Sequence, residues 1–201
     1  MLRDVYPIEA LIRQNGNDRM ELVMSSTDSA DISRDAGIRY RVIDSPVGEL
    51  TLVGHGDGLS AVYFAEHKRR PLTEAFGLRD DESFTDAVTQ LAEYFAGDRT
   101  TFDLTLAPAG DGFQLKVWAL LRAIPYGQTR SYGQLAALLG DRNLARAVGT
   151  ANGKNPLSII VPCHRVVGAD GSLIGYAGGL DRKRFLLGLE EPAEVGIDRL
   201  F

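Results

Sequence analysis

Between residues 38 and 65, apolar and polar side chains alternate with a period of two. Three short runs of this kind are separated by turn residues, first Ser45-Pro46 with Gly48 and then Gly56-Asp57-Gly58. A period of two is typical of strands that bury one face, and such turns join antiparallel neighbours. The pattern therefore predicts a three-stranded antiparallel meander.

After the meander, the apolar residues change to the spacing of a helix. Residues 83–86 (SFTD) resemble a capping box that begins this helix, and Gly97 ends it, with Val88, Leu91 and Phe95 as its apolar positions. Strands followed by one helix, acidic and without evident chemistry, predict a small α/β N-terminal domain. Its expected role is support.

The second half of the chain is predicted to be mainly helical. Apolar spacing indicates a helix over residues 111–123, which the Ile-Pro-Tyr-Gly run at 124–127 ends. Ser131 is a plausible cap for a helix over 132–139, and a second short helix follows over roughly 143–152. Two short helices with a glycine in the turn form a helix-turn-helix arrangement, which is also common in proteins that never touch DNA.

Composition and cysteine usage limit the setting. With 44% hydrophobic and 24% charged residues, the 201-residue chain has the composition of a soluble globular protein. No apolar run approaches a membrane span, the N-terminal residues form no secretory signal, and a single cysteine suits a reducing cytosol. We expect a cytoplasmic protein with no membrane partner. His55 and His67 have no cysteines at zinc-ligand spacing and are predicted to be surface histidines.

The net charge of −5 is unevenly distributed along the chain. Residues 1–109 hold 11 Lys/Arg against 19 Asp/Glu, whereas residues 110–190 hold 10 against 5. Attraction to phosphates depends on a local positive patch and not on the total charge. The basic second half therefore stays compatible with nucleic-acid binding. Within it, the short side chains of Ala145, Ala147 and Gly149 around Arg146 suit close approach to a duplex, with the arginine projecting.

The single cysteine is the main candidate for chemistry. Cys163 follows Pro162 and directly precedes His164, an arrangement that suits an activated nucleophile, although a buried structural cysteine is equally compatible with this run alone. Adjacent side chains on a strand point to opposite faces, so a local turn or a water is needed to join the two. Five glycines within residues 168–179 favour a pocket wall for a flat polar group.

A last helix is predicted over residues 181–190. Asp181 is its plausible N-cap, and Phe185, Leu186 and Leu189 are expected to face inward. Glu190 ends this helix and could reach back to a histidine in the pocket, although an isolated glutamate is more often solvated.

The run from Phe113 to Glu190 resembles the O6-alkylguanine-DNA alkyltransferases, also called methylated-DNA–protein-cysteine methyltransferases. The order and spacing of several motifs agree without gaps: Ile124-Pro125-Tyr126-Gly127, Ser131-Tyr132, Ala145-Arg146-Ala147-Val148-Gly149, Asn155-Pro156, Pro162-Cys163-His164-Arg165-Val166-Val167 and Gly175-Tyr176. Residues 38–97 also resemble the ribonuclease-H-like N-terminal domain of this family. The resemblance implies an N-terminal domain over 38–109 and a C-terminal DNA-binding and alkyl-acceptor domain over 110–191.

This resemblance also implies a reaction and its residues. Cys163 would accept an alkyl group from O6 of guanine in double-stranded DNA, and the protein would be consumed in one turnover. His164 would act as the base on Cys163, with Glu190 orienting its imidazole. The damaged base must leave the DNA duplex to react. Arg146 would fill the space that it leaves in the base stack, and Tyr132 would assist the rotation of the nucleotide. Asn155 would be a hinge, and the guanine pocket would be lined by Tyr176, the Val166 carbonyl and backbone N–H groups near Ala177.

Two departures from the family pattern are visible. Ala177 stands where many members carry serine, and the cysteines that hold structural zinc in some members are absent. We therefore expect no metal and no cofactor, and a protein that acts as a monomer. Residues 1–37 are predicted to be a disordered polar leader and residues 192–201 a C-terminal tail.

Three other functions stay open at the level of sequence. A sensor that binds alkylguanine without repairing it would lack the reactive cysteine. A Cys-His hydrolase would turn over and gives no role to Arg146. A transcription factor could use the helix-turn-helix alone, with Cys163 incidental.

Overall fold

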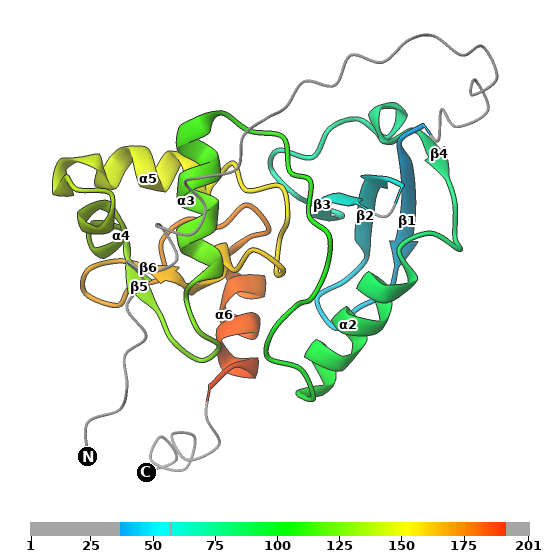
Figure 1. Ribbon diagram of the computed structural model, residues 1–201. Coiled ribbons are helices and arrows are strands. Elements are labelled where there is room, and N and C mark those ends of the chain that lie inside the picture. The colour runs from blue at the N-terminus through cyan, green and yellow to red at the C-terminus, as the bar shows by residue number, and fades with distance from the viewer. Residues whose placement is uncertain (1–36, 57, 192–201) are drawn as a thin grey trace, which may run out of the picture. The chain divides into compact units, whose positions relative to one another are not determined.

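The computed structural model describes residues 37–56 and 58–191, which belong to one compact unit of the chain, residues 36–201. The predicted leader, apart from Gly37, and the predicted tail lie outside the described residues. Within the described part, no helix has both the length and the apolar character needed to cross a bilayer. A small sheet with one helix forms the first part of the unit, and four helices form the second (Figure 1).

The sheet is the predicted meander with one additional strand. Strands β1 (Arg39–Ile43), β2 (Leu50–His55) and β3 (Gly58–Phe64) pair antiparallel, which confirms the prediction. A fourth strand, β4 (Leu78–Arg79), pairs parallel with β1 and completes the order β3-β2-β1-β4. Two residues are too few to produce an alternating pattern, which is why β4 could not be predicted.

One glycine sets the geometry at the end of β2. The register between β2 and β3 shifts between Val53 and Gly54, as in a β-bulge. A Cβ atom on Gly54 would lie 2.2 Å from the carbonyl oxygen of Gly58 and 2.8 Å from the ring of Phe84. A side chain at this position would therefore displace both the hairpin and the ring that covers it.

Helix α2 (Thr85–Ala96) covers the sheet and ends at Gly97 in the left-handed conformation, as predicted. It buries Leu91 and Tyr94, whereas the predicted apolar positions Val88 and Phe95 are only half-buried. The predicted capping box is wrong. The residue before the helix is Phe84, with a positive φ and no side-chain cap, and the Ser83 hydroxyl donates to Asp80 instead.

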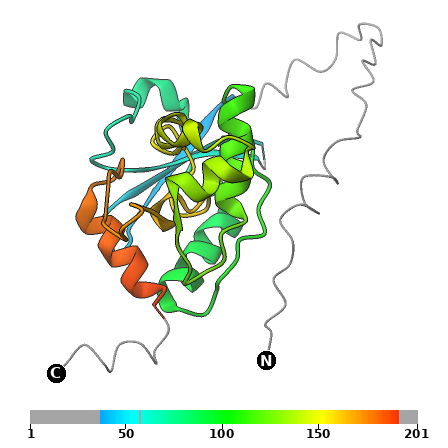
Figure 2. The ribbon, with the colours of Figure 1, turned by 90° about the vertical axis from the view of Figure 1, so that its left-hand side faces the viewer.

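The second part contains the helices α3 (Gly112–Arg122), α4 (Tyr132–Leu138), α5 (Ala145–Asn152) and α6 (Leu180–Leu189). Asp111 and Ser131 begin α3 and α4 as N-caps of complete capping boxes. Helices α4 and α5 lie side by side as the predicted helix-turn-helix (Figure 2). A short parallel pair, β5 (Arg130–Ser131) and β6 (Val166–Val167), joins the start of α4 to the segment after Cys163.

Backbone hydrogen bonds join the second part to the edge of the sheet. Val62 on β3 donates to the carbonyl of Pro156 and accepts from the N–H of Ser158. Leu59 forms a similar pair of bonds with residues 105 and 107. The segment that leads to Cys163 is thus held against the edge strand β3, and the sheet serves as the platform on which the candidate site is built.

Three predictions need correction, one about the start of a helix and two about the burial of side chains. Helix α6 begins after Gly179 and not at Asp181, because glycine at positive φ makes the sharp entry into the helix. Phe185 is 43% exposed, and Lys183 takes the buried place one turn before Leu186. His67 is buried and not on the surface, because its ring packs against Phe64.

Candidate functional site

Cys163 and His164 lie in a single 3-10 turn, Cys163–Arg165, directly after a buried apolar segment. The Arg165 N–H donates to the carbonyl of Pro162 at 3.0 Å, which closes the turn. The turn breaks the strand geometry that would send neighbouring side chains to opposite faces. All three side chains of the turn are buried, and His164 is fully enclosed.

Glu190 is the centre of a buried hydrogen-bond network. Its Oε1 atom lies 2.8 Å from His164 Nε2, and it also accepts from the Tyr94 hydroxyl at 2.7 Å. Arg165 donates to both carboxylate oxygens, from Nε at 2.8 Å and from Nη2 at 3.0 Å. The Gly127 N–H donates to Oε2 at 3.3 Å. Glu190 therefore does contact His164, as expected from the sequence. Its contacts with Tyr94, Arg165 and Gly127 were not expected.

The charges in this network assign the tautomer of His164. Burial alone would raise the pKa of Glu190, but the hydrogen bonds from His164 and Arg165 outweigh it and lower the pKa to about 2. Burial lowers the pKa of His164 despite the carboxylate, so the ring is neutral near pH 7. A neutral ring beside an ionised carboxylate donates through Nε2–H. Nδ1 is then an acceptor, and it has no hydrogen-bond partner among the described residues.

The thiol is protonated at rest. Burial raises the pKa of Cys163, and a hydrogen bond from the Asn155 side chain and the charge of Lys183 only partly oppose this shift. A protonated thiol is a weak nucleophile, so the site needs a base to generate the thiolate. His164 is the neutral base beside it in sequence, with a free acceptor nitrogen.

Lys183 is a site residue that sequence analysis missed. Its ammonium group is buried and donates to the carbonyls of Val166 at 2.6 Å and Ile174 at 2.9 Å. Burial lowers its pKa to about 8. The available signal was its spacing from Leu186 and Glu190, which places all three on one face of the helix. The Val166 carbonyl, predicted to face the pocket, is thus already engaged by this lysine.

Asn155 ties the loop before the cysteine together. Its Nδ2 atom donates to the Val161 carbonyl at 2.8 Å, and its Oδ1 atom accepts from the Leu157 N–H at 3.0 Å. These bonds fix the segment between α5 and Cys163, which is the position that a hinge residue would occupy.

A cavity of about 190 Å³ opens onto Cys163. The hydroxyl of Tyr176 and Oδ1 of Asn152 are both buried among its lining residues without a hydrogen-bond partner in the described structure. Buried polar atoms are normally paired, so both are available to a polar ligand. The lining comes from both parts of the unit: Lys68, Arg69, Tyr132, Gly149, Asn152, Gly153, Cys163, Gly175, Tyr176 and Ala177.

The helix-turn-helix supplies one wall of this cavity. Tyr132, the first residue of α4, lines it and donates through its hydroxyl to the Ile174 carbonyl at 3.3 Å. Gly149 on α5 also lines it. Arg146 is exposed on α5, between half-buried Ala145 and exposed Ala147, and does not line the cavity. Of the predicted DNA-facing residues, Tyr132 and Gly149 therefore also line the cavity, whereas Arg146 does not.

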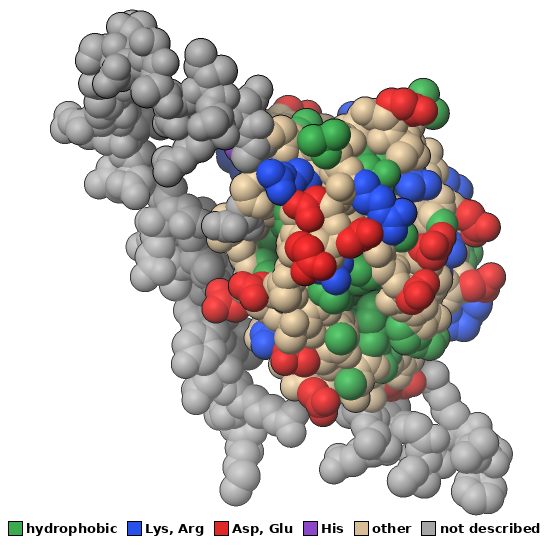
Figure 3. Space-filling model, turned by 90° about the vertical axis from the view of Figure 1, so that its right-hand side faces the viewer, with side chains coloured by type: hydrophobic (Ala, Val, Ile, Leu, Met, Phe, Trp, Pro, Cys, Tyr) green, Lys and Arg blue, Asp and Glu red, His purple; other side chains and the backbone are tan. Residues whose placement is uncertain are grey.

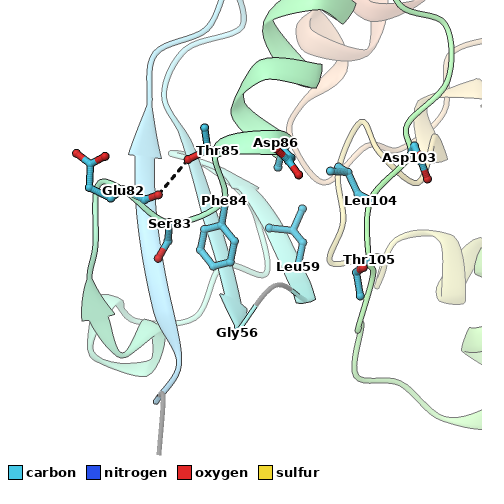
Figure 4. A pocket seen from close by; sticks show the side chains of 11 residues that line it. Gly56, Leu59, Glu82, Ser83, Phe84, Thr85, Asp86, Asp103, Leu104 and Thr105 are labelled. Carbon is cyan, nitrogen blue, oxygen red and sulfur yellow. Dashed lines mark hydrogen bonds between the residues drawn. The ribbon is translucent and has the colours of Figure 1, made fainter. Parts of the chain in front are cut away.

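A larger cavity, about 630 Å³, lies between α2 and residues 103–105 and is separate from the cysteine. Figure 4 shows Phe84 and Leu59 on its wall, beside the start of α2. Three of its lining residues are acidic, Glu82, Asp86 and Asp103, and none is a cysteine or histidine. Its volume is greater, but its lining holds no thiol or imidazole, and its carboxylates repel phosphate. Among the described residues, no cluster of three or more His, Cys, Asp or Glu side chains could hold a metal ion.

Two family models match consecutive parts of the chain. The model described as 6-O-methylguanine DNA methyltransferase, ribonuclease-like domain, matches residues 38–108. The model described as the DNA binding domain of the same family matches residues 112–192. The two matches lie on either side of the segment that joins the sheet to the helices.

Curated relatives and solved structures agree with these matches. A methylated-DNA–protein-cysteine methyltransferase of Mycobacterium bovis is 53% identical over 161 residues, which are 79% of this chain and 97% of the relative. One of Methanosarcina acetivorans is 48% identical over 151 residues, which are 75% of this chain and 97% of the relative. The crystal structure of Mycobacterium tuberculosis OGT in complex with DNA is similar with a TM-score of 0.73, 51% identity and coverage of 78% of this chain and 97% of that one.

Proposed function

The chain belongs to the 6-O-methylguanine DNA methyltransferase family, and on this premise we propose that it repairs DNA by moving an alkyl group from O6 of guanine to its own Cys163. The observation that carries the proposal is the buried turn that places Cys163 at a cavity with His164 as its neutral neighbour. The solved relative bound to DNA supports DNA as the partner.

The reaction balances as a single displacement. The thiol proton passes to His164 Nδ1, directly or through a water, and the sulfur attacks the alkyl carbon. A sulfur–carbon bond forms as the carbon–O6 bond breaks, and the bond electrons leave with O6. The imidazolium returns its proton, directly or through water, to N1 of guanine, and the protein keeps a thioether. Because water does not hydrolyse a thioether, the thiol is not regenerated and each protein molecule reacts once.

Glu190 and Arg165 position the base. The carboxylate holds Nε2–H of His164 and so turns Nδ1 into the acceptor, and its negative charge stabilises the imidazolium that forms. Arg165 fixes the carboxylate through two hydrogen bonds. Asn155 and Lys183 lower the pKa of Cys163 against the effect of burial, so they favour the thiolate.

The helix-turn-helix extracts the damaged base. A base inside a duplex cannot reach Cys163, and removing it from the stack costs a few kcal/mol. Arg146, exposed on α5 beside small residues, fills the vacated space, and Tyr132, which lines the cavity, assists the rotation of the base. Asn152 and Tyr176 then offer unpaired polar atoms to the edge of the extruded base. That the protein works as a monomer in the cytoplasm stays a prediction from the sequence.

Titration with a damaged duplex tests this proposal. The wild-type protein should remove methyl groups from an O6-methylguanine duplex up to one equivalent and then stop. Cys163→Ser should remove none and still bind the damaged duplex more tightly than an undamaged one. Repeated turnover by the wild type would favour a Cys-His hydrolase, and a Cys163→Ser variant that still repairs would move the acceptor elsewhere.

A further inference from the structure

We infer that Lys68 and Arg69, from the acidic first part of the chain, form an anion-binding lip on the Cys163 cavity that holds an anionic oxygen group of the damaged nucleotide. The inference rests on the proposed function and extends it to a segment that sequence analysis assigned to support. The lip is defined by these two residues.

Both residues line the same cavity as Cys163 and Tyr132. Among the described residues, no acidic side chain lines this cavity. Two exposed cations therefore face an opening that ends at the candidate nucleophile. Such an opening attracts a negatively charged ligand, because an uncompensated positive wall concentrates anions near it.

The backbone of the lip is fixed in place. The Lys68 N–H donates to the carbonyl of Ala177, a pocket residue, at 3.1 Å, and the Arg69 N–H donates to His67 Nδ1 at 3.2 Å. His67 is buried against Phe64, and burial together with the Arg69 charge lowers its pKa to about 4. The ring is therefore neutral and remains an acceptor at neutral pH. The loop that begins at Lys68 is therefore held by a backbone N–H hydrogen bond at each of its first two residues.

Neighbouring arginines are already engaged within the protein. Arg70 donates to Thr51 at 3.2 Å and lies over the ring of Phe76. Arg182 donates to the carbonyls of Val47 at 2.7 Å and Gly178 at 3.0 Å. By contrast, the side chains of Lys68 and Arg69 have neither a hydrogen bond nor an ion pair within the described residues. These two cations are thus free to bind an external group.

An anionic oxygen group reaches the lip from either of two sources. A nucleotide whose base enters the cavity brings its backbone phosphates to the entrance, and arginine binds phosphate oxygens in pairs. An O6-alkyl group that ends in a carboxylate would carry the charge inside instead. Both sources offer the same chemistry, an oxyanion within reach of a guanidinium and an ammonium group.

The experiment compares three substrates. The double variant Lys68→Ala/Arg69→Ala and the charge-retaining Lys68→Arg are assayed with an O6-methylguanine duplex, an O6-carboxymethylguanine duplex and free O6-benzylguanine. Arg79→Ala is the matched control, because it removes an exposed cation from the same part of the chain, where it pairs with Asp81 away from the cavity. The salt dependence of duplex binding is measured for each variant.

If phosphate is the ligand, the double variant should react about tenfold more slowly with both duplexes, the factor of one charge-assisted hydrogen bond. The slope of log affinity against log salt should shrink by about 1 for each phosphate that the variant no longer binds. Slowing confined to the carboxymethyl duplex would identify the alkyl carboxylate instead. In either case, Lys68→Arg, Arg79→Ala and the reaction with free O6-benzylguanine should match the wild type.

Equal slowing on all three substrates, or no change on either duplex, would overturn the inference. A wild type that fails to alkylate Cys163 would instead contradict the proposed function and would leave the lip without a reaction to serve. The two failures are therefore distinguishable.

Discussion

The two parts of the compact unit differ in what they bring to the site. The helical second part holds Cys163, His164 and the helix-turn-helix, whereas the sheet part holds none of these. Yet the sheet part reaches the site twice, through the Tyr94 hydroxyl on Glu190 and through the loop at Lys68 beside Ala177. A part that looks like support therefore fixes the glutamate of the relay and one edge of the cavity.

The two parts also differ in charge. The first 109 residues hold 11 basic against 19 acidic residues, whereas residues 110–190 hold 10 against 5. Figure 3 shows the result on the side of the sheet, where acidic and basic side chains are interspersed without a continuous basic surface. This distribution favours DNA binding at the helical part, and among the cations of the sheet part we propose a role for those that line the cavity. The variants below test how far the chemical and the supporting roles are separated between the helical part and the sheet part.

The largest effect is expected from the buried network in the helical part. Glu190→Gln leaves the buried guanidinium of Arg165 without its carboxylate, and removing one partner of a buried pair costs about 3–5 kcal/mol. Alkyl transfer should slow on duplex and free base alike, and the pKa of Cys163 should rise. Chemical denaturation and thiol titration measure these effects. Glu66→Gln, at an exposed position, is the control, and a variant with unchanged thiol pKa and rate would remove Glu190 from the relay.

The same carboxylate predicts an acid-dependent loss of stability. Its pKa is lowered from 4.5 to about 2 in the folded protein, so its contribution is complete above pH 4.5 and is lost as pH falls toward 2. The melting temperature of Glu190→Gln should therefore approach that of the wild type over this interval. Parallel curves for the two proteins would show that the carboxylate is not the group that titrates.

Arg146→Ala should produce the next largest effect, and only on DNA. Because Arg146 is exposed on α5 and does not line the cavity, repair of duplex O6-methylguanine should slow about tenfold or more, since unstacking costs a few kcal/mol. Reaction with free O6-benzylguanine should be unchanged. Arg184→Ala, another exposed arginine of the helical part, serves as the control. Equal slowing of both substrates would place Arg146 in the pocket or in the fold.

Tyr94→Phe tests what the sheet part contributes to the network around Glu190. The change removes one of several donors to Glu190, and a hydrogen bond to a charged group contributes about 1.5–3 kcal/mol. Stability and transfer should fall moderately, and transfer should fall equally on duplex and free base. A variant that loses stability while its thiol pKa and rate stay unchanged would confine Tyr94 to packing.

The smallest effect is expected from deleting residues 1–37. The sequence of this segment has few apolar residues at regular spacing, so the repair rate and the melting temperature should stay nearly unchanged. Calorimetry and the duplex assay on the shortened chain check this expectation, and a clear loss in either would give the segment a role in the fold or in repair.

The sequence was most informative where its pattern is local. The meander, the cap Ser131 and the helix-turn-helix follow from periodicity and a short capping motif, which depend on neighbouring residues. The buried state of His67 and Lys183 did not follow, because it depends on how the folded chain packs His67 against Phe64 and brings Lys183 to the carbonyls of Val166 and Ile174. The contact of Tyr94 with Glu190 could not be predicted either, because Glu190 lies 96 residues further along the chain.

The mass of the intact protein after reaction with DNA tests the proposed transfer to Cys163 most directly. The protein is incubated with an excess of O6-methylguanine duplex, weighed by mass spectrometry and then digested to locate any added group. We predict one methyl group per chain, on Cys163, with no further addition as DNA increases. Restored DNA beside an unmodified protein, or a methyl group on any other residue, would contradict this transfer.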